Sequence, residues 1–125
     1  IQSIQYTNYK KINRVSEIKN LSYEEYLIKQ INRSITEKNE EINKNNKEIE
    51  KTNTEIKKID SHLSELNIEL DISVGNQAED IKNDINTYKT QREAYEEYIL
   101  ECQQNINRLN NEIFDLKENI ETLKQ

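Results

Sequence analysis

Apolar residues recur along the chain at alternating intervals of three and four positions. From Ile28 to Leu70 this spacing gives thirteen positions, ten of them apolar, and a second series runs from Ala78 to Leu123 with only Arg92 departing from it. Such ladders are typical of helices that bury a narrow seam against another helix. The seam residues that this pattern predicts are Ile28, Ile35, Ile42, Ile49, Ile56, Leu63 and Leu70 in the first ladder and Ile81, Tyr88, Tyr95, Cys102, Leu109, Leu116 and Leu123 in the second.

Between the two ladders, residues 71–77 break the spacing and contain the only glycine of the chain, Gly75. Glycine adopts positive φ without steric cost and therefore suits the end of a helix. Asn76, followed three residues later by Glu79, resembles a capping box that starts the next helix. We therefore predict a helix over 22–72, a turn over 73–76 and a helix over 77–125.

In an antiparallel hairpin, the residue numbers of each facing pair must add up to the same value. If Leu70 faces Ile81, the residue numbers in every later layer must add up to 151, and they do so throughout both ladders. The centre of symmetry falls between Gly75 and Asn76, the place that turn chemistry indicates independently. The predicted fold is all-α, an antiparallel two-helix coiled-coil hairpin with a short N-terminal helical segment.

Charged residues beside the seam give little help in setting this alignment. We expect Arg92 to reach outward, with Asp60 placed opposite Lys89 beside it, whereas Glu41 would face Glu112. Ion pairs at a solvent-exposed flank contribute little in any case. The isoleucine layers and the turn must therefore set the register.

The first 21 residues follow a different pattern. Ser22 and Glu25 resemble a capping box that starts the long helix, and the apolar residues before it have no cover inside the hairpin. We predict a division into an N-terminal segment, 1–21, with a possible docking surface, and the hairpin, 22–125. Residues expected to contact a partner are Tyr6, Tyr9, Ile12, Val15 and Ile18, with Leu100 and Phe114 on the outer face of the second helix.

Composition limits the classes of protein to which the chain can belong. With 33% hydrophobic and 34% charged residues it is too polar for a thick globular core, while the absence of proline argues against disorder. The net charge of −6, with both signs interspersed, offers no basic face for nucleic acid. No apolar run is long enough for membrane insertion. The absence of methionine suggests a piece of a longer protein or a processed product.

Candidate chemistry is sparse. His62 is the only histidine, and Glu65 and Glu69 beside it make too weak a cluster for a metal site. Cys102 is the only cysteine; we expect it to pack opposite Ile49, and a lone thiol favours a reducing compartment such as the cytoplasm. Two straight helices enclose no cavity that could desolvate a catalytic group. We therefore expect no catalytic residues, no cofactor, no metal and no small-molecule ligand.

These features favour a structural spacer or tether that mediates protein–protein interaction within a larger protein or assembly. Its partners would be other proteins or further copies of the chain. Two alternatives remain open: a surface antigen or receptor-recognition module, and a coiled-coil arm of a chromosome-maintenance ATPase. A secretion signal in the full gene would favour the surface antigen or recognition module, and nucleotide-binding motifs outside this segment would favour the ATPase arm.

Overall fold

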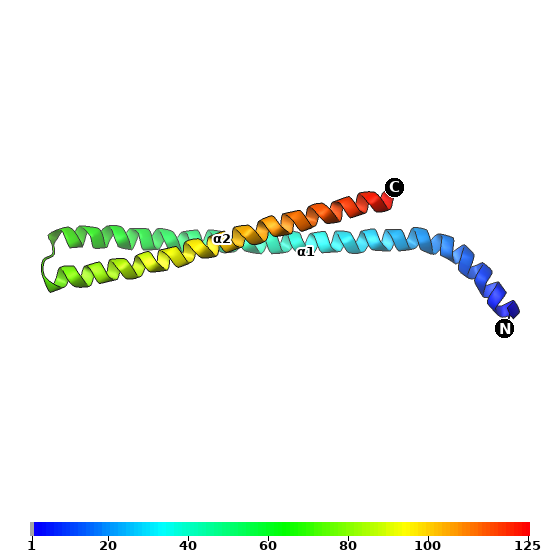
Figure 1. Ribbon diagram of the computed structural model, residues 1–125, viewed down its shortest axis with the longest axis horizontal. Coiled ribbons are helices and arrows are strands. Elements are labelled where there is room, and N and C mark those ends of the chain that lie inside the picture. Colours follow the sequence, from blue (N-terminus) through cyan, green and yellow to red (C-terminus); the bar gives the residue numbers. More distant parts are fainter. Residues whose placement is uncertain (1) are drawn as a thin grey trace. The chain divides into compact units, whose positions relative to one another are not determined.

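The computed structural model describes the backbone of residues 2–125 and the side chains of residues 23–125. Two helices, α1 (Gln2–Ile72) and α2 (Asn76–Lys124), are joined by a three-residue connection (Figure 1). The described backbone contains no strand. Because the two helices pack against each other, the predicted all-α helical hairpin is confirmed.

The first helix begins much earlier than the sequence pattern predicts. Its backbone is helical from Gln2 and continues through Ser22, so the predicted helix start at residue 22 is wrong. No proline or glycine occurs before Gly75, and an internal serine costs a helix only about 0.5 kcal/mol relative to alanine. A capping pattern can therefore lie within a continuous helix. The side chains of the predicted docking residues Tyr6, Tyr9, Ile12, Val15 and Ile18 lie outside the described residues.

Ser73 closes the C-terminal end of α1. Its backbone N–H donates to the carbonyl oxygen of Leu70 at 3.2 Å, and its hydroxyl donates to the carbonyl oxygen of Glu69 at 2.6 Å. These bonds occupy two of the carbonyls that a helix end leaves without partners. Sequence analysis placed Ser73 in the turn but did not predict this role.

Gly75 reverses the chain and opens α2. Its φ of 65° lies in the left-handed region that other residues rarely adopt. Its carbonyl oxygen accepts the backbone N–H of Glu79 at 3.2 Å, which is the first hydrogen bond of α2. The side chain of Asn76 makes no hydrogen bond, so the predicted capping box is wrong and a backbone contact takes its place. The helix begins one residue before the predicted start and ends one residue before the predicted end.

The chain divides into two compact units, each built from a stretch of both helices. We call Glu40–Leu109 the turn unit, because it contains the connection between α1 and α2. We call Ile1–Asn39 together with Asn110–Gln125 the end unit.

The core of the turn unit is a narrow row of side chains between the two helices. All of its buried residues lie on the three-and-four series, and the other members of that series in this unit are half-buried. Burying one isoleucine or leucine contributes about 1.5–3 kcal/mol, so this row is the main stabilising element. The buried residues are Thr52, Ile56 and Ile59 from α1 and Ile81, Ile85, Cys102 and Leu109 from α2.

The end unit has the same organisation over its described side chains. Ile35, Ile113 and Ile120 are buried, and the remaining seam positions are half-buried. Lys38, the one polar seam residue here, places its Nζ 2.8 Å from Oε2 of Glu112. The prediction that flanking charges do not help the alignment is wrong at this place, because a lysine stem can lie along the seam while its ammonium group reaches the flank.

Candidate functional site

Side chains reach from one helix to the other at four places in the turn unit. The residue numbers of these pairs add up to between 146 and 152, close to the predicted 151. In an antiparallel pair, residue numbers rise along one helix as they fall along the other, so the sum for each contacting pair stays nearly constant. These four contacts are therefore those of an antiparallel alignment close to the predicted register. The four pairs are Asn45 with Asn105, Glu48 with Tyr98, Asp60 with Arg92, and His62 with Tyr88.

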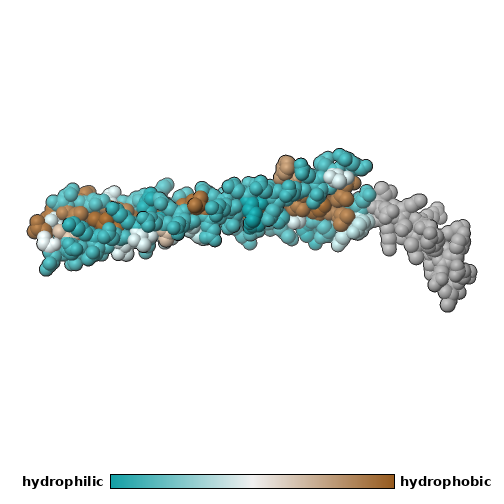
Figure 2. Space-filling view, viewed as in Figure 1, coloured by the Kyte–Doolittle hydropathy of each residue, from teal (hydrophilic) through white to brown (hydrophobic). Residues whose placement is uncertain are grey.

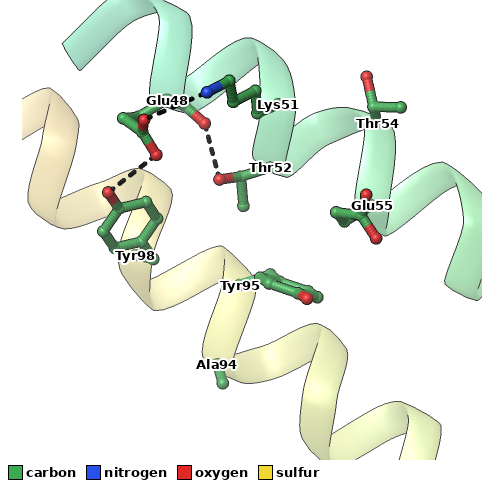
Figure 3. A pocket seen from close by; sticks show the side chains of 8 residues that line it. All are labelled: Glu48, Lys51, Thr52, Thr54, Glu55, Ala94, Tyr95 and Tyr98. Atoms are coloured by element: carbon green, nitrogen blue, oxygen red, sulfur yellow. Dashed lines mark hydrogen bonds and ion pairs between the residues drawn. The ribbon is translucent and has the colours of Figure 1, made fainter. Parts of the chain in front are cut away.

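An open groove lies on one flank of the turn unit, between α1 and α2 (Figure 3). At one end, the hydroxyl of Tyr98 donates to Oε2 of Glu48 at 3.2 Å, and Nζ of Lys51 lies 3.9 Å from Oε1 of the same carboxylate. The hydroxyl of Thr52 donates to the backbone carbonyl of Glu48 at 2.7 Å, which explains how this polar side chain is buried. The small side chains of Thr52 and Ala94 leave the hollow between the helices.

The groove changes the ionisation of Tyr98. Partial desolvation of the phenol raises its pKa above the usual 10.0, and the negative charge of Glu48 raises it further. The phenol therefore stays protonated at neutral pH and donates to Glu48. A group whose pKa moves away from neutrality is less suited to general acid–base chemistry at neutral pH.

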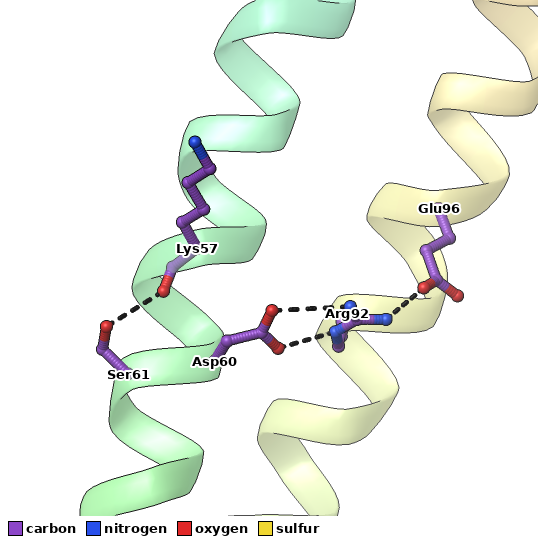
Figure 4. A network of polar contacts seen from close by, with 5 residues as sticks. All are labelled: Lys57, Asp60, Ser61, Arg92 and Glu96. Carbon is purple, nitrogen blue, oxygen red and sulfur yellow. Dashed lines mark hydrogen bonds and ion pairs between the residues drawn. The ribbon is translucent and has the colours of Figure 1, made fainter.

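Arg92 forms a second polar cluster on the turn unit (Figure 4). Its Nε lies 2.8 Å from Oδ1 of Asp60, its Nη2 lies 3.4 Å from Oδ2, and its Nη1 pairs with Glu96. Asp60, which the predicted register places opposite Lys89, therefore forms its ion pair with Arg92. The planar guanidinium matches both carboxylate oxygens, which a single ammonium group cannot do. The hydrogen bond that Arg92 donates to Asp60 raises the pKa of Arg92.

The single histidine has a structural contact that sequence analysis did not foresee. The ring of His62 stacks on that of Tyr88, with ring centroids 5.2 Å apart and an interplanar angle of 14°. Its Nδ1 lies 4.0 Å from a carboxylate oxygen of Glu65. No group of three or more histidine, cysteine, aspartate or glutamate side chains within residues 23–125 could hold a metal ion. Cys102 is a buried free thiol.

The two predicted contact residues on α2 are both exposed, but they belong to different units. Leu100 lies in the turn unit, whereas Phe114 lies in the end unit beside an open depression that is lined by residues of α2 and by Gln125. Whether either residue contacts a partner stays a prediction. No helix in the described part of the chain is long and apolar enough to cross a membrane.

The most exposed apolar residues of the described chain lie at the turn, and the sequence pattern did not single out Ile72 and Val74 among them. Val74 is 84% exposed, Ile72 is 83% exposed, and Ile68 is 66% exposed. The available signal was their position: Ile72 follows the last seam residue, Leu70, by two positions and so falls outside the ladder. A search restricted to seam positions passes over such residues.

Comparison of the chain with protein-family models, with curated proteins and with solved structures gives no match. The function must therefore follow from the chemistry of the surfaces and contacts in the chain itself.

Proposed function

We propose that this chain is a coiled-coil spacer or tether that holds other proteins at a fixed separation within a larger protein or assembly. The observation that carries the proposal is the distribution of burial. In both units the seam residues are buried or half-buried, while nearly all other described side chains are exposed. In such a molecule most apolar residues are buried between the two helices, and the outer surface and the ends remain accessible to partners.

The three-and-four spacing supports the coiled-coil part of this proposal. A strict seven-residue repeat drifts around a straight helix, so two helices that keep such a seam in contact wind around each other. The cross-helix pairs Asn45–Asn105 and Asp60–Arg92 support the same alignment, because they lie far apart along the helices and obey nearly the same numerical sum.

The ionisable groups support a structural role and not catalysis. The pKa shifts at Tyr98 and Arg92 are both upward, away from neutrality. The depressions found on the described surface are open to solvent, so they desolvate the groups that line them only in part and do not enclose a reacting group. We therefore propose that the chain acts without catalysis and binds proteins or other copies of itself.

A spacer must have a fixed length, which can be measured within the turn unit. Helix α1 should span about 44 Å from Asn43 to its end at Ile72, at a rise of about 1.5 Å per residue, and Val74 lies two residues beyond that end, about 46 Å from Asn43. Nitroxide labels at these two exposed positions, in a Cys102→Ala background, report the distance by double electron–electron resonance. A matched pair at Asn43 and Asn107, which lie one position from facing each other in the predicted register, provides the short control.

The expected result is a narrow distribution centred near 46 Å for the first pair and a much shorter distance for the control pair. A broad distribution for the first pair would contradict a rigid spacer. A long distance for the control pair would contradict the antiparallel hairpin in solution.

A further inference from the structure

The end of the hairpin at the turn carries an exposed apolar surface. Ile68, Ile72 and Val74 lie within seven residues of one another and are all largely exposed. Hydrophobic side chains gather at this end of the molecule in the space-filling view (Figure 2). Single exposed apolar residues are common, whereas a cluster of them marks a contact surface. We call these three residues the tip patch.

The net charge of the chain is concentrated around the tip patch. Residues 59–81 contain six acidic side chains and no lysine or arginine, so with His62 neutral this stretch alone has a formal charge of −6, equal to that of the whole chain. Asp60 pairs with Arg92. Glu69, Asp71, Glu79 and Asp80, which are closer to the turn, are exposed and form no ion pair. The tip patch therefore sits in a field of uncompensated negative charge.

Part of this charge acts against the stability of the hairpin. The last turn of α1 contains no basic residue, and Glu69 and Asp71 lie at its end. The C-terminal end of a helix carries partial negative charge, so carboxylates there are unfavourable. Residues that are unfavourable for the fold, as these carboxylates are at the end of α1, tend to mark functional sites when no nearby contact offsets their cost. Here they surround the three most exposed aliphatic side chains of the described chain.

We infer that the tip patch docks a partner protein whose contact surface is an apolar groove flanked by lysine or arginine side chains. Charge complementarity selects this occupant, because the acidic residues around the patch attract a basic rim and align it. A second copy of the tip is a poor occupant, since two tips would place like charges against each other. This inference rests on the proposed spacer role and names the end at which the spacer holds a partner.

The test uses a defined probe with the chemistry of the inferred partner. The probe is a helical peptide of leucine and lysine with one apolar face, titrated into the ¹⁵N-labelled chain and followed by amide chemical shifts. A second peptide with serine in place of leucine keeps the charge alone, and a third with glutamate in place of lysine reverses it. The chain carries either Ile72→Ser with Val74→Ser, or the control Tyr26→Ser, which removes an exposed aromatic side chain of the end unit.

We expect the leucine–lysine peptide to shift amides around residues 68–80, and the double substitution to weaken this binding at least about tenfold. Tyr26→Ser should leave it unchanged. Asp71→Lys with Asp80→Lys, a second variant that keeps the apolar residues, should weaken it as well. Circular dichroism verifies that each variant is helical.

Three outcomes would overturn the inference. One is equal binding of the wild type and the double variant, and another is equal binding of the serine and leucine peptides, because charge alone would then suffice. The third is a concentration-dependent shift of tip amides without peptide, which would identify a second copy as the occupant. None of these changes the distance between labels at Asn43 and Val74, so failure of the docking surface is distinguishable from failure of the spacer.

Discussion

Arg92 of α2 contacts Asp60 of α1 through both Nε and Nη2, although it occupies a position of the apolar seam. Its side chain is half-buried, and Asp60 is half exposed. An exposed carboxylate that loses its partner is solvated at little cost, whereas a leucine at the seam would bury apolar area. The Asp60–Arg92 contact therefore fixes alignment more than it adds stability.

We accordingly expect Arg92→Leu to raise the melting temperature by about 5 °C, a typical response for a domain of this size to a gain of one buried side chain. Circular dichroism at 222 nm gives the melting temperature, and light scattering shows whether larger species appear as the polar marker of register is lost. Asp60→Asn is the control, because it removes the ion pair but keeps the arginine, and it should change little. A lower melting temperature for Arg92→Leu would mean that the ion pair is a major stabilising contact.

Gly75 should resist substitution for reasons of backbone geometry alone. A Cβ added at this position would meet no atom within 4 Å, but the φ of 65° is unfavourable for a residue with a side chain. We expect Gly75→Ala to lower the free energy of unfolding by about 1 kcal/mol, and Gly75→Asn to lower it by less, because asparagine tolerates the left-handed region. Urea unfolding measures both. Equal stability of the alanine variant and the wild type would show that the turn has another conformation.

The register can be tested with the native cysteine. Cys102 is buried and Ile49 is half-buried, and the predicted register places them in the same layer. Ile49→Cys should therefore form an intramolecular disulfide with Cys102 on mild oxidation, and this bond should add about 2–4 kcal/mol to the free energy of unfolding. Ile42→Cys, one heptad away, is too distant for the required Cβ spacing and serves as control. Oxidation that gives only dimers of Ile49→Cys at low concentration would show that the alignment is wrong.

The seam could be predicted from the sequence because burial of apolar side chains dominates helix pairing and has a fixed period. Each buried isoleucine contributes about 1.5–3 kcal/mol, so the spacing of residues such as Ile56 and Ile81 determines which faces meet. Exposed ion pairs contribute about 0–1 kcal/mol each. The choice of Arg92 over Lys89 as the partner of Asp60 depends on such small differences, and heptad spacing does not contain them.

The start of α1 and the exposure of Ile72 and Val74 at the tip could not be predicted from the sequence, for two other reasons. Ser22 has the chemistry of a helix start, but a continuous run without proline or glycine can extend a helix through it. Ile72 and Val74 lie outside the ladder, and a pattern that searches for buried positions assigns no role to apolar residues elsewhere. Their exposure became evident only once the helix end and the connection had been placed.

Tyr98 should remain protonated to higher pH than an ordinary tyrosine. Its pKa is raised in the folded chain, first by desolvation and then by the charge of Glu48, so its contribution to stability is present below pH 10 and is lost as pH rises through the folded pKa. NMR of ¹³C-labelled tyrosine follows the phenol directly, and Glu48→Gln should move its pKa downward while leaving the desolvation effect. A Tyr98 titration at the ordinary pH in the wild type would mean that the groove is fully solvated in solution.

The acidic end of α1 provides a test of whether negative charge near the tip patch lowers the free energy of unfolding. Asp71 is exposed in the last turn of α1, which contains no basic residue. Removing its charge with Asp71→Asn should raise the free energy of unfolding by about 0.5 kcal/mol, and reversing it with Asp71→Lys should raise it by about 1 kcal/mol, because a cation interacts favourably with the C-terminal end of a helix dipole. Urea unfolding at low salt measures this graded series. In 1 M salt, where charges are screened beyond about 3 Å, the three proteins should converge. A loss of stability in Asp71→Lys would instead show that the carboxylate has a local partner that supports the turn. Negative charge at the tip would then serve the fold, and its presence would not indicate a basic partner.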